Sequence, residues 1–186
     1  MRQSVYIQSL VNAVVGSSEA SDWHSAVREW RIFDVEEDLT LSESCVCGHP
    51  NLRYLFTIQN TINGCLLFPI GSECIKKFER PELYEEANVM QELFKLLHAF
   101  EENQFLTLSP DFFSRKLLLY LNQLGAFKPT SYNGYNPFND YSFMLDMFNK
   151  RDRRSELQEK KVRAIIMNQI RPFLQDMLRD KVRRNV

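Results

Sequence analysis

The sequence contains no long hydrophobic run, and no stretch of it approaches the 18 apolar residues of a membrane-crossing helix. The first residues, MRQSVYIQSLVNAVV, hold only Arg2 before a short amphipathic stretch that Gln8 and Asn12 interrupt. We read this stretch as a helix and not as a signal peptide. We therefore expect a cytoplasmic protein with no membrane partner. In that reducing compartment the four cysteines are expected to remain thiols or to bind metal.

Histidine is scarce, with three residues in the chain, and the common catalytic motifs are missing. The sequence has no H-E-x-x-H, no G-x-x-x-x-G-K-S/T and no G-x-S-x-G, and no histidine pair of the nuclease type. We therefore expect that the protein is not an enzyme.

The chain has 186 residues and a normal apolar share of 44%, with 14 Phe and 7 Tyr for a core or a partner surface. This size favours one compact unit. Within it we expect an N-terminal lobe, residues 1–80, of helices and a zinc-bound hairpin, and a helical lobe, residues 81–186. The expected fold class is α+β, mostly helical with a treble-clef-like zinc-bound β-hairpin.

The clearest strand signal is LRYLFTIQNTINGCLLFPIG, in which aromatic and β-branched residues flank Asn63-Gly64. An Asn-Gly pair suits a two-residue type I′ turn, which would place Ile58 opposite Pro69. We also expect the segment WRIFDVEEDLTLSES to be a short strand that runs into a solvated loop with the acidic residues Asp34, Glu36, Glu37 and Asp38. The remaining periodic segments, from residue 72 to the C-terminus, are predicted to be helices, the last one kinked at Pro172.

Charge is distributed unevenly along the chain. Residues 1–106 carry 8 basic and 16 acidic side chains, whereas residues 107–186 carry 15 basic and 8 acidic ones. The basic excess lies from Lys150 onward. This polarity favours electrostatic steering toward a charged partner, although it also suits plain solubility.

The segment ESCVCGHP places two cysteines one residue apart and follows them with a glycine and a histidine. Zinc sites often take two ligands from such a knuckle, because the glycine lets backbone amides turn toward the sulfur, although the usual knuckle has two intervening residues. After the hairpin the chain reaches GSEC, which puts Cys74 in the first turn of a helix, where the macrodipole favours a thiolate. Knuckle, hairpin and helix follow the order of a treble clef. We expect Cys45, Cys47 and Cys74 to bind a structural zinc ion.

The fourth ligand is open at this stage. A treble clef takes it one turn after Cys74, but that position is Lys77. Cys65 lies beside the hairpin tip, about 20 Å of strand away, and is expected to be a buried apolar residue. Between His49 and His24 we choose His49, because Pro50 stiffens the exit of the chain from the knuckle.

The block SCVCGHPNLRYLFTIQNTINGCLLFPIGSECIKKF, and more loosely FFSRKLLLYL and DYSFMLDMFNKR, resembles small proteins of phages and mobile genetic elements of Gram-positive bacteria. These include zinc-binding type II-A anti-CRISPR proteins, which inhibit Cas9 by binding it and are not enzymes. The resemblance implies that Cys45, Cys47 and Cys74 match family positions, that the partner is a Cas9-type effector protein, and that the chain acts in the host cytoplasm.

Two functions follow from these observations. The first is an interaction protein that binds the recognition lobe of Cas9 and blocks loading of target DNA, since the acidic charge is too dilute to mimic a duplex. The alternative is a nucleic-acid-binding phage accessory protein that contacts phosphates through the segments KRDRRSELQEKKVR and RDKVRR.

Overall fold

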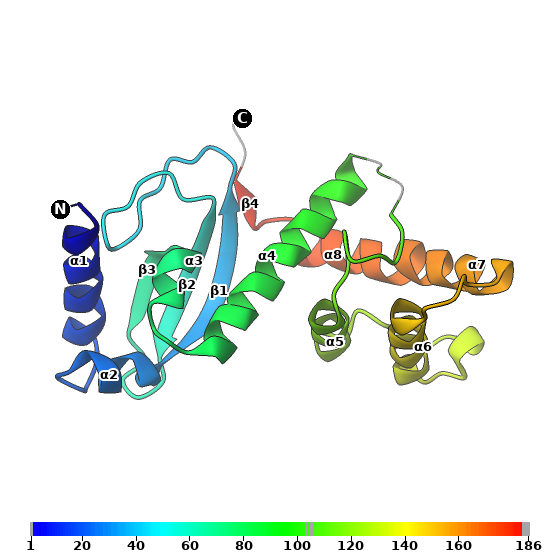
Figure 1. The fold of residues 1–186 in the computed structure, drawn as a ribbon, viewed down its shortest axis with the longest axis horizontal. Helices are drawn as coiled ribbons and strands as arrows, with labels where there is room; N and C mark the ends of the chain where they lie inside the picture. Colours follow the sequence, from blue (N-terminus) through cyan, green and yellow to red (C-terminus); the bar gives the residue numbers. More distant parts are fainter. Residues whose placement is uncertain (1, 103, 105, 184–186) are drawn as a thin grey trace. The chain divides into compact units, whose positions relative to one another are not determined.

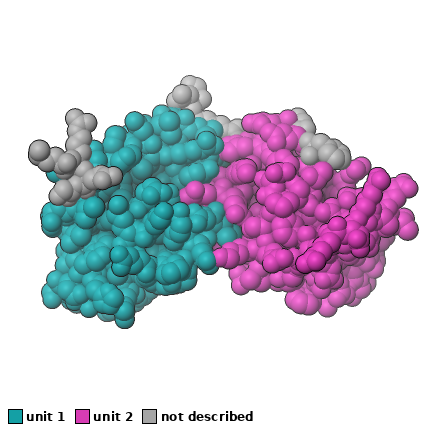
Figure 2. All heavy atoms as spheres, in the orientation of Figure 1, with its two compact units in different colours: residues 1–90, 180–186 teal, residues 91–179 magenta. Residues whose placement is uncertain are grey.

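The computed structural model describes residues 2–102, 104 and 106–183 and divides the chain into two compact units (Figure 1, Figure 2). Unit 1 comprises residues 1–90 and 180–186, and unit 2 comprises residues 91–179. The fold is α+β, as the sequence predicted, because unit 1 contains a four-stranded sheet and unit 2 is helical. Among the described residues, no helix is both long enough and apolar enough to cross a membrane.

The boundary between the units differs from the division expected at residue 80. The helix α4 (Pro81–Glu101) begins in unit 1 and ends in unit 2, and residues 180–186 return to unit 1. Unit 1 therefore holds 10 basic and 14 acidic residues, and unit 2 holds 13 basic and 10 acidic ones. The charge contrast between the units is smaller than that between the halves of the sequence, because the basic C-terminus belongs to the acidic unit.

The sheet of unit 1 has the strand order β3-β2-β1-β4. Neighbouring strands β3 and β2, and β2 and β1, are antiparallel, whereas β4 lies parallel to β1. The strands are β1 (Trp30–Asp38), β2 (Tyr54–Asn60), β3 (Leu66–Ile70) and β4 (Val182–Arg183).

Strand β1 corrects the expectation of a short strand followed by a solvated acidic loop. Its nine residues include the whole acidic run, and Glu37 and Asp38 are completely buried. The strand extends through the acidic residues because β2 pairs with it on one side and β4 on the other. Buried carboxylates need partners, and each of these two has one: Arg53 pairs with Glu37, and hydrogen bonds from Thr40 and Ser42 satisfy Asp38.

The hairpin of β2 and β3 lies where the sequence predicted it, but its turn is longer. Ile58 faces Leu67 and not Pro69. The amide of Asn60 closes a loop of residues 61–64, and the side-chain carbonyl of Asn60 accepts two hydrogen bonds from amides of that loop. The predicted two-residue turn is wrong, because Asn60 caps a four-residue loop in its place.

Helices of unit 1 pack on the sheet and complete its core. They are α1 (Arg2–Gly16), α2 (Trp23–Ala26), the 3₁₀ turn η1 (Val27–Glu29) and α3 (Ser72–Lys76). Asp22 begins α2 by accepting a hydrogen bond from the amide of Ser25, as an N-cap does. The largest fully buried side chains of this core include Leu10, Trp30, Leu55, Phe56, Ile58, Ile70, Ile75 and Phe78.

Unit 2 consists of helices whose starts are marked by capping residues. Ser114, Asn136 and Ser155 each accept a hydrogen bond from a backbone amide at a helix start. The elements are α5 (Arg115–Gln123), the 3₁₀ turn η2 (Ser131–Asn133), α6 (Pro137–Asn149), α7 (Glu156–Ile165), the π-helical turn η3 (Ile166–Ile170) and α8 (Arg171–Leu178).

The last helical segment, for which the sequence predicted a kink at Pro172, changes its hydrogen-bond pattern directly before that residue. The π-helical turn η3 interrupts it directly before α8, whose first turn contains Pro172. Proline has no N–H for the preceding turn, so the helix rearranges its hydrogen bonds there.

Candidate metal centre

Cys45 and Cys47 lie in a tight turn between β1 and β2. The amide of Gly48 donates to the carbonyl oxygen of Cys45 at 2.6 Å, and the amide of Cys45 donates to the carbonyl of His49 at 2.9 Å. Gly48 has φ +91°, a conformation that residues with a Cβ rarely adopt. This backbone turns both cysteine side chains toward the same point.

The third cysteine reaches that point through the hairpin. Cys74 lies in the first turn of α3, and its amide donates to the carbonyl of Gly71 at 2.9 Å. The amide of Val46 donates to the carbonyl of Pro69 at 2.9 Å, which fixes the cysteine turn to β3. The end of β3 and the start of α3 therefore carry Cys74 to the other two cysteines.

The three sulfur atoms form one buried cluster. The Sγ atom of Cys74 lies 3.5 Å from that of Cys45 and 3.5 Å from that of Cys47, and all three lie within 4.8 Å of one another. The residues are 4%, 4% and 6% exposed, in the order Cys45, Cys47 and Cys74, and all three are free thiols. A disulfide would need about 2.05 Å, whereas two thiolates on one tetrahedral zinc ion, with Zn–S bonds of about 2.3 Å, lie about 3.8 Å apart. The cluster therefore fits the donor set of a single metal ion.

The three thiols are not equivalent. The hydrogen bond that Cys45 shares with Cys74 lowers the pKa of Cys45 to about 5, and this effect outweighs its burial. The same hydrogen bond, together with burial, raises the pKa of Cys74. Burial also raises the pKa of Cys47. The lowered pKa of Cys45 favours its thiolate, whereas Cys47 and Cys74 favour the thiol, so binding of a metal ion by all three sulfurs would release protons.

The Cys45 sulfur accepts a further hydrogen bond from the backbone. The amide of Gly71 lies 3.5 Å from Sγ of Cys45. A Cβ atom at Gly71 would lie 3.0 Å from the side chain of Leu52, so a larger residue here would require Leu52 to move. Gly71 is the N-cap of α3, and its position directly before the helix of Cys74 is the signal in the sequence for this contact.

The structure places the two candidate histidines outside the three-sulfur cluster. The Nδ1 atom of His49 lies 3.0 Å from the carbonyl oxygen of Pro50, and its exposed ring meets the ring of Tyr6 edge-on at 5.6 Å. His24 lies on α2 with its Nε2 atom 2.8 Å from the guanidinium of Arg28.

Cys65 lies at the end of the hairpin, apart from the other three cysteines, and its amide donates to the side chain of Asn63. The expectation that Cys65 is buried is wrong, because this residue is exposed. Its carbonyl accepts the hydrogen bond from the amide of Asn60 that closes the four-residue loop, directly before the first residue of β3.

A pocket of about 390 Å³ opens beside the cluster. Its lining includes all three cysteines, His49, Tyr6 and Lys77. Tyr6 comes from α1 and lies so close to Gly48 that a methyl group on this glycine would meet the tyrosine ring at 3.7 Å. No pattern in the sequence connects Tyr6 with the cysteines, since α1 lies far from them in the chain. The imidazole of His49 thus shares one pocket with the three sulfurs.

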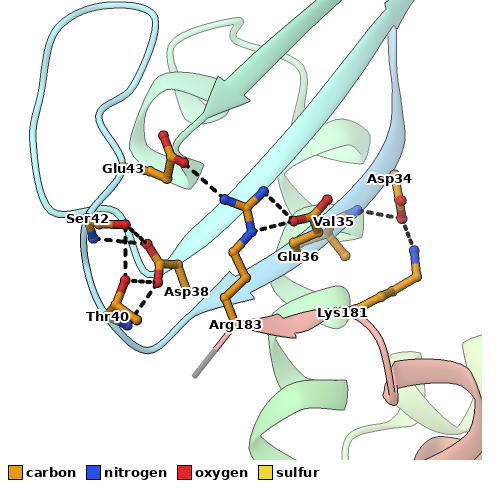
Figure 3. A network of polar contacts seen from close by, with 9 residues as sticks. All are labelled: Asp34, Val35, Glu36, Asp38, Thr40, Ser42, Glu43, Lys181 and Arg183. Atoms are coloured by element: carbon orange, nitrogen blue, oxygen red, sulfur yellow. Dashed lines mark hydrogen bonds and ion pairs between the residues drawn. The ribbon is translucent and has the colours of Figure 1, made fainter. Parts of the chain in front are cut away.

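The C-terminal strand holds a second polar cluster in unit 1 (Figure 3). The guanidinium of Arg183 pairs with Glu36 at 2.6 Å and with Glu43 at 3.0 Å, and Lys181 pairs with Asp34. The segment RDKVRR therefore directs two of its basic side chains at carboxylates of β1 and of the following loop. Those two cations are compensated within the chain.

Comparison of the chain with family models, with curated proteins and with solved structures finds no match in any of the three.

Proposed function

We propose that unit 1 is a zinc-stabilised module and that the chain works as a non-enzymatic interaction protein. The observation that carries this proposal is the buried cluster of three sulfurs within 4.8 Å of one another, supplied by two segments that the hairpin brings together. Thiolates favour Zn²⁺, Cu(I) and iron–sulfur clusters, and among these zinc is the ion held by isolated cysteine and histidine ligands in small structural modules.

The arrangement of the ligands supports a treble-clef-like site. A cysteine turn, the hairpin β2–β3 and the short helix α3 follow one another, and Cys74 lies in the first turn of that helix. The fourth ligand in this proposal is His49, which lies two residues after Cys47 and shares its pocket. If its Nδ1 atom were the ligand, the imidazole would have to give up its contact with the carbonyl oxygen of Pro50.

Four protein ligands make the zinc structural. Catalytic zinc keeps one coordination position for water or substrate, and a site filled by three cysteines and His49 has no such position. The ion then serves to lock the cysteine turn to the start of α3, so that unit 1 presents a fixed surface.

The partner that we propose is a Cas9-type effector protein, on the resemblance of the cysteine block to type II-A anti-CRISPR proteins. Inhibition would follow from binding to its recognition lobe and blocking the loading of target DNA in the bacterial cytoplasm.

The test is a sizing column with a purified type II-A Cas9 at about 1 μM of each protein, a concentration that detects a dissociation constant below that value. Comigration of the wild type and of Cys65→Ser, but not of Cys74→Ser, is the expected result. If the protein bound zinc but did not comigrate with Cas9, the proposed partner would be rejected and the proposed zinc module would be retained.

A nucleic-acid-binding role is the second proposal. Arg153, Arg154 and Arg163 line an open groove of about 640 Å³ in unit 2. Two observations weigh against a nucleic-acid-binding role. Arg154 already donates hydrogen bonds to the carbonyls of Leu108 and Met147, and acidic side chains share the groove. A mobility shift with a DNA duplex that weakens steeply with salt would support this role, because cation–phosphate contacts release counterions; no shift at low salt would remove it.

A further inference from the structure

A second groove, distinct from the metal centre, lies entirely within unit 2. It has a volume of about 880 Å³ and runs between the η2 loop and the helix pair α7–η3. Residues 128–132 form one wall, and residues 157–169 of α7 and η3 form the other. This volume is in the range of sites that hold a short peptide segment or a large ligand.

The groove is rigid on the side of the loop. The side chain of Asn133 donates to the carbonyl of Lys128 and to the carboxylate of Asp140, and the backbone amide of Lys128 donates to the side chain of Gln169. These contacts fix the loop to both α6 and η3. A preformed wall lowers the entropic cost of binding.

Two large side chains in the lining are almost completely exposed. Tyr132 on the loop is 92% exposed and Leu157 on α7 is 78% exposed. Ala164, two turns after Leu157 on the same helix, continues the apolar lining. Exposed apolar side chains that face a shared groove mark interaction sites more strongly than scattered ones, and tyrosine is enriched in protein interfaces.

The polar part of the lining is cationic. Lys128, Lys160 and Lys161 line the groove. The acidic residue at its floor, Asp140, is buried and accepts hydrogen bonds from Asn133 and Gln169, with Lys161 at 3.5 Å. Lys160 also pairs with Glu156 at 3.1 Å, but Glu156 is not part of the lining. The lining thus holds three lysines and one carboxylate, and this net positive charge is complementary to negative charge.

We propose that this groove docks a segment of a partner protein that carries acidic residues together with a large apolar side chain. The apolar side chain packs between Tyr132 and Leu157, and the acidic residues meet the lysines. A protein segment fits better than single-stranded nucleic acid, because successive bases stack on several aromatic side chains, whereas Tyr132 is the one aromatic residue of this lining. This inference rests on the proposed function only in assuming a protein partner, and it names the surface that such a partner contacts.

The test is selection of a displayed library of random 12-residue peptides on the full-length protein. The expected result is enrichment of sequences with Asp or Glu and with Leu, Phe or Trp. The selected peptides should bind at least about tenfold more weakly to Leu157→Ser and to Lys160→Glu, as expected when a central contact of an interface is lost. Both side chains are exposed, so circular dichroism should show unchanged folding.

Matched controls are Tyr135→Ala and Leu119→Ser, which alter exposed apolar residues of unit 2 outside the groove lining. They should bind the selected peptides as the wild type does. Enrichment of basic peptides, no enrichment, or equal loss in the control variants would overturn the proposal. The protein could also bind a labelled 20-nucleotide oligo-dT more tightly than it binds the selected peptides. If Lys160→Glu abolished that binding, the groove would be a nucleic-acid site and the proposal would be overturned. Unit 2 contains none of the cysteines, so a failure to bind zinc leaves this test unaffected.

Discussion

The sulfur atoms of Cys45 and Cys74 lie 3.5 Å apart although 29 positions separate the two residues. The contact depends on the hairpin, which returns the chain to the cysteine turn, and on the hydrogen bond from Val46 to Pro69, which holds turn and hairpin together. A metal ion at this point would add a strong crosslink between the cysteine turn and the start of α3, which the structure already joins through hydrogen bonds from Val46 and Gly71. The stability of unit 1 should therefore depend on the ion.

The first prediction concerns metal content. The wild type should carry about one zinc ion per chain by elemental analysis. Cys74→Ser should carry less than about a tenth of that and should unfold at a lower temperature, because metal binding supplies folding free energy in small structural sites. Cys65→Ser is the matched control and should retain both the zinc and the melting temperature, since Cys65 is exposed and apart from the cluster. Zinc loss in Cys65→Ser, or a metal-free wild type that is fully folded, would contradict the proposed centre.

The second prediction separates the candidate histidines. In the Co²⁺-substituted protein, His49→Ala should shift the visible absorption bands and weaken metal affinity by about tenfold or more, because a nitrogen ligand is replaced by water. His24→Ala should leave the spectrum unchanged. An unchanged spectrum in both variants would mean that neither imidazole binds the ion.

The third prediction concerns pH and Asp38. Burial opposes ionisation of this carboxylate, but the hydrogen bonds from Thr40 and Ser42 outweigh it and lower the pKa from an ordinary value of 3.8 to about 2. A lowered pKa means that the folded state binds the proton less readily than the unfolded chain does. The stabilisation is therefore complete above about pH 4 and is lost as the pH falls toward 2.

Asp38→Asn tests this dependence by urea unfolding across the pH range. The variant should be less stable than the wild type by about 1.5–3 kcal/mol at neutral pH, the cost expected when hydrogen bonds to a charged group are lost. The difference should shrink between pH 4 and pH 2. A difference that is constant over that range would show that the charge of Asp38 does not contribute.

The fourth prediction concerns the C-terminal ion pairs of Figure 3. Arg183→Ala should lower the free energy of unfolding by about 1 kcal/mol or less at low salt, because its pairs with Glu36 and Glu43 are partly exposed and screened. The loss should decrease at 1 M NaCl, where the Debye length is about 3 Å. Arg179→Ala, whose pair with Asp176 is far more exposed, should change stability by only a few tenths of a kcal/mol. An effect of Arg183→Ala that is independent of salt would assign the loss to packing against Phe68.

The hairpin shows how far local sequence reasoning extends. Its two strands were predicted because β-branched and aromatic residues flank a turn signal, and both strands are present. The turn was wrong because the Asn-Gly pattern competes with Asn60, whose side chain caps two loop amides. Both turn types are compatible with the same short sequence, so the pairing of β2 with β1 and β3 decides between them.

Local sequence was sufficient for the features that depend on neighbouring residues: the cysteine turn with its glycine and the placement of Cys74 in a first helical turn. Their chemistry operates over a few positions, so it is visible in a short stretch of sequence.

The folded chain was needed to show that the acidic run lies in a central strand, and that Lys181 and Arg183 compensate carboxylates 147 positions away. It was also needed to show that Cys65 is exposed and that Tyr132 and Leu157 face one groove. Burial and charge pairing at such separations depend on which segments folding brings together, and no local pattern encodes that choice.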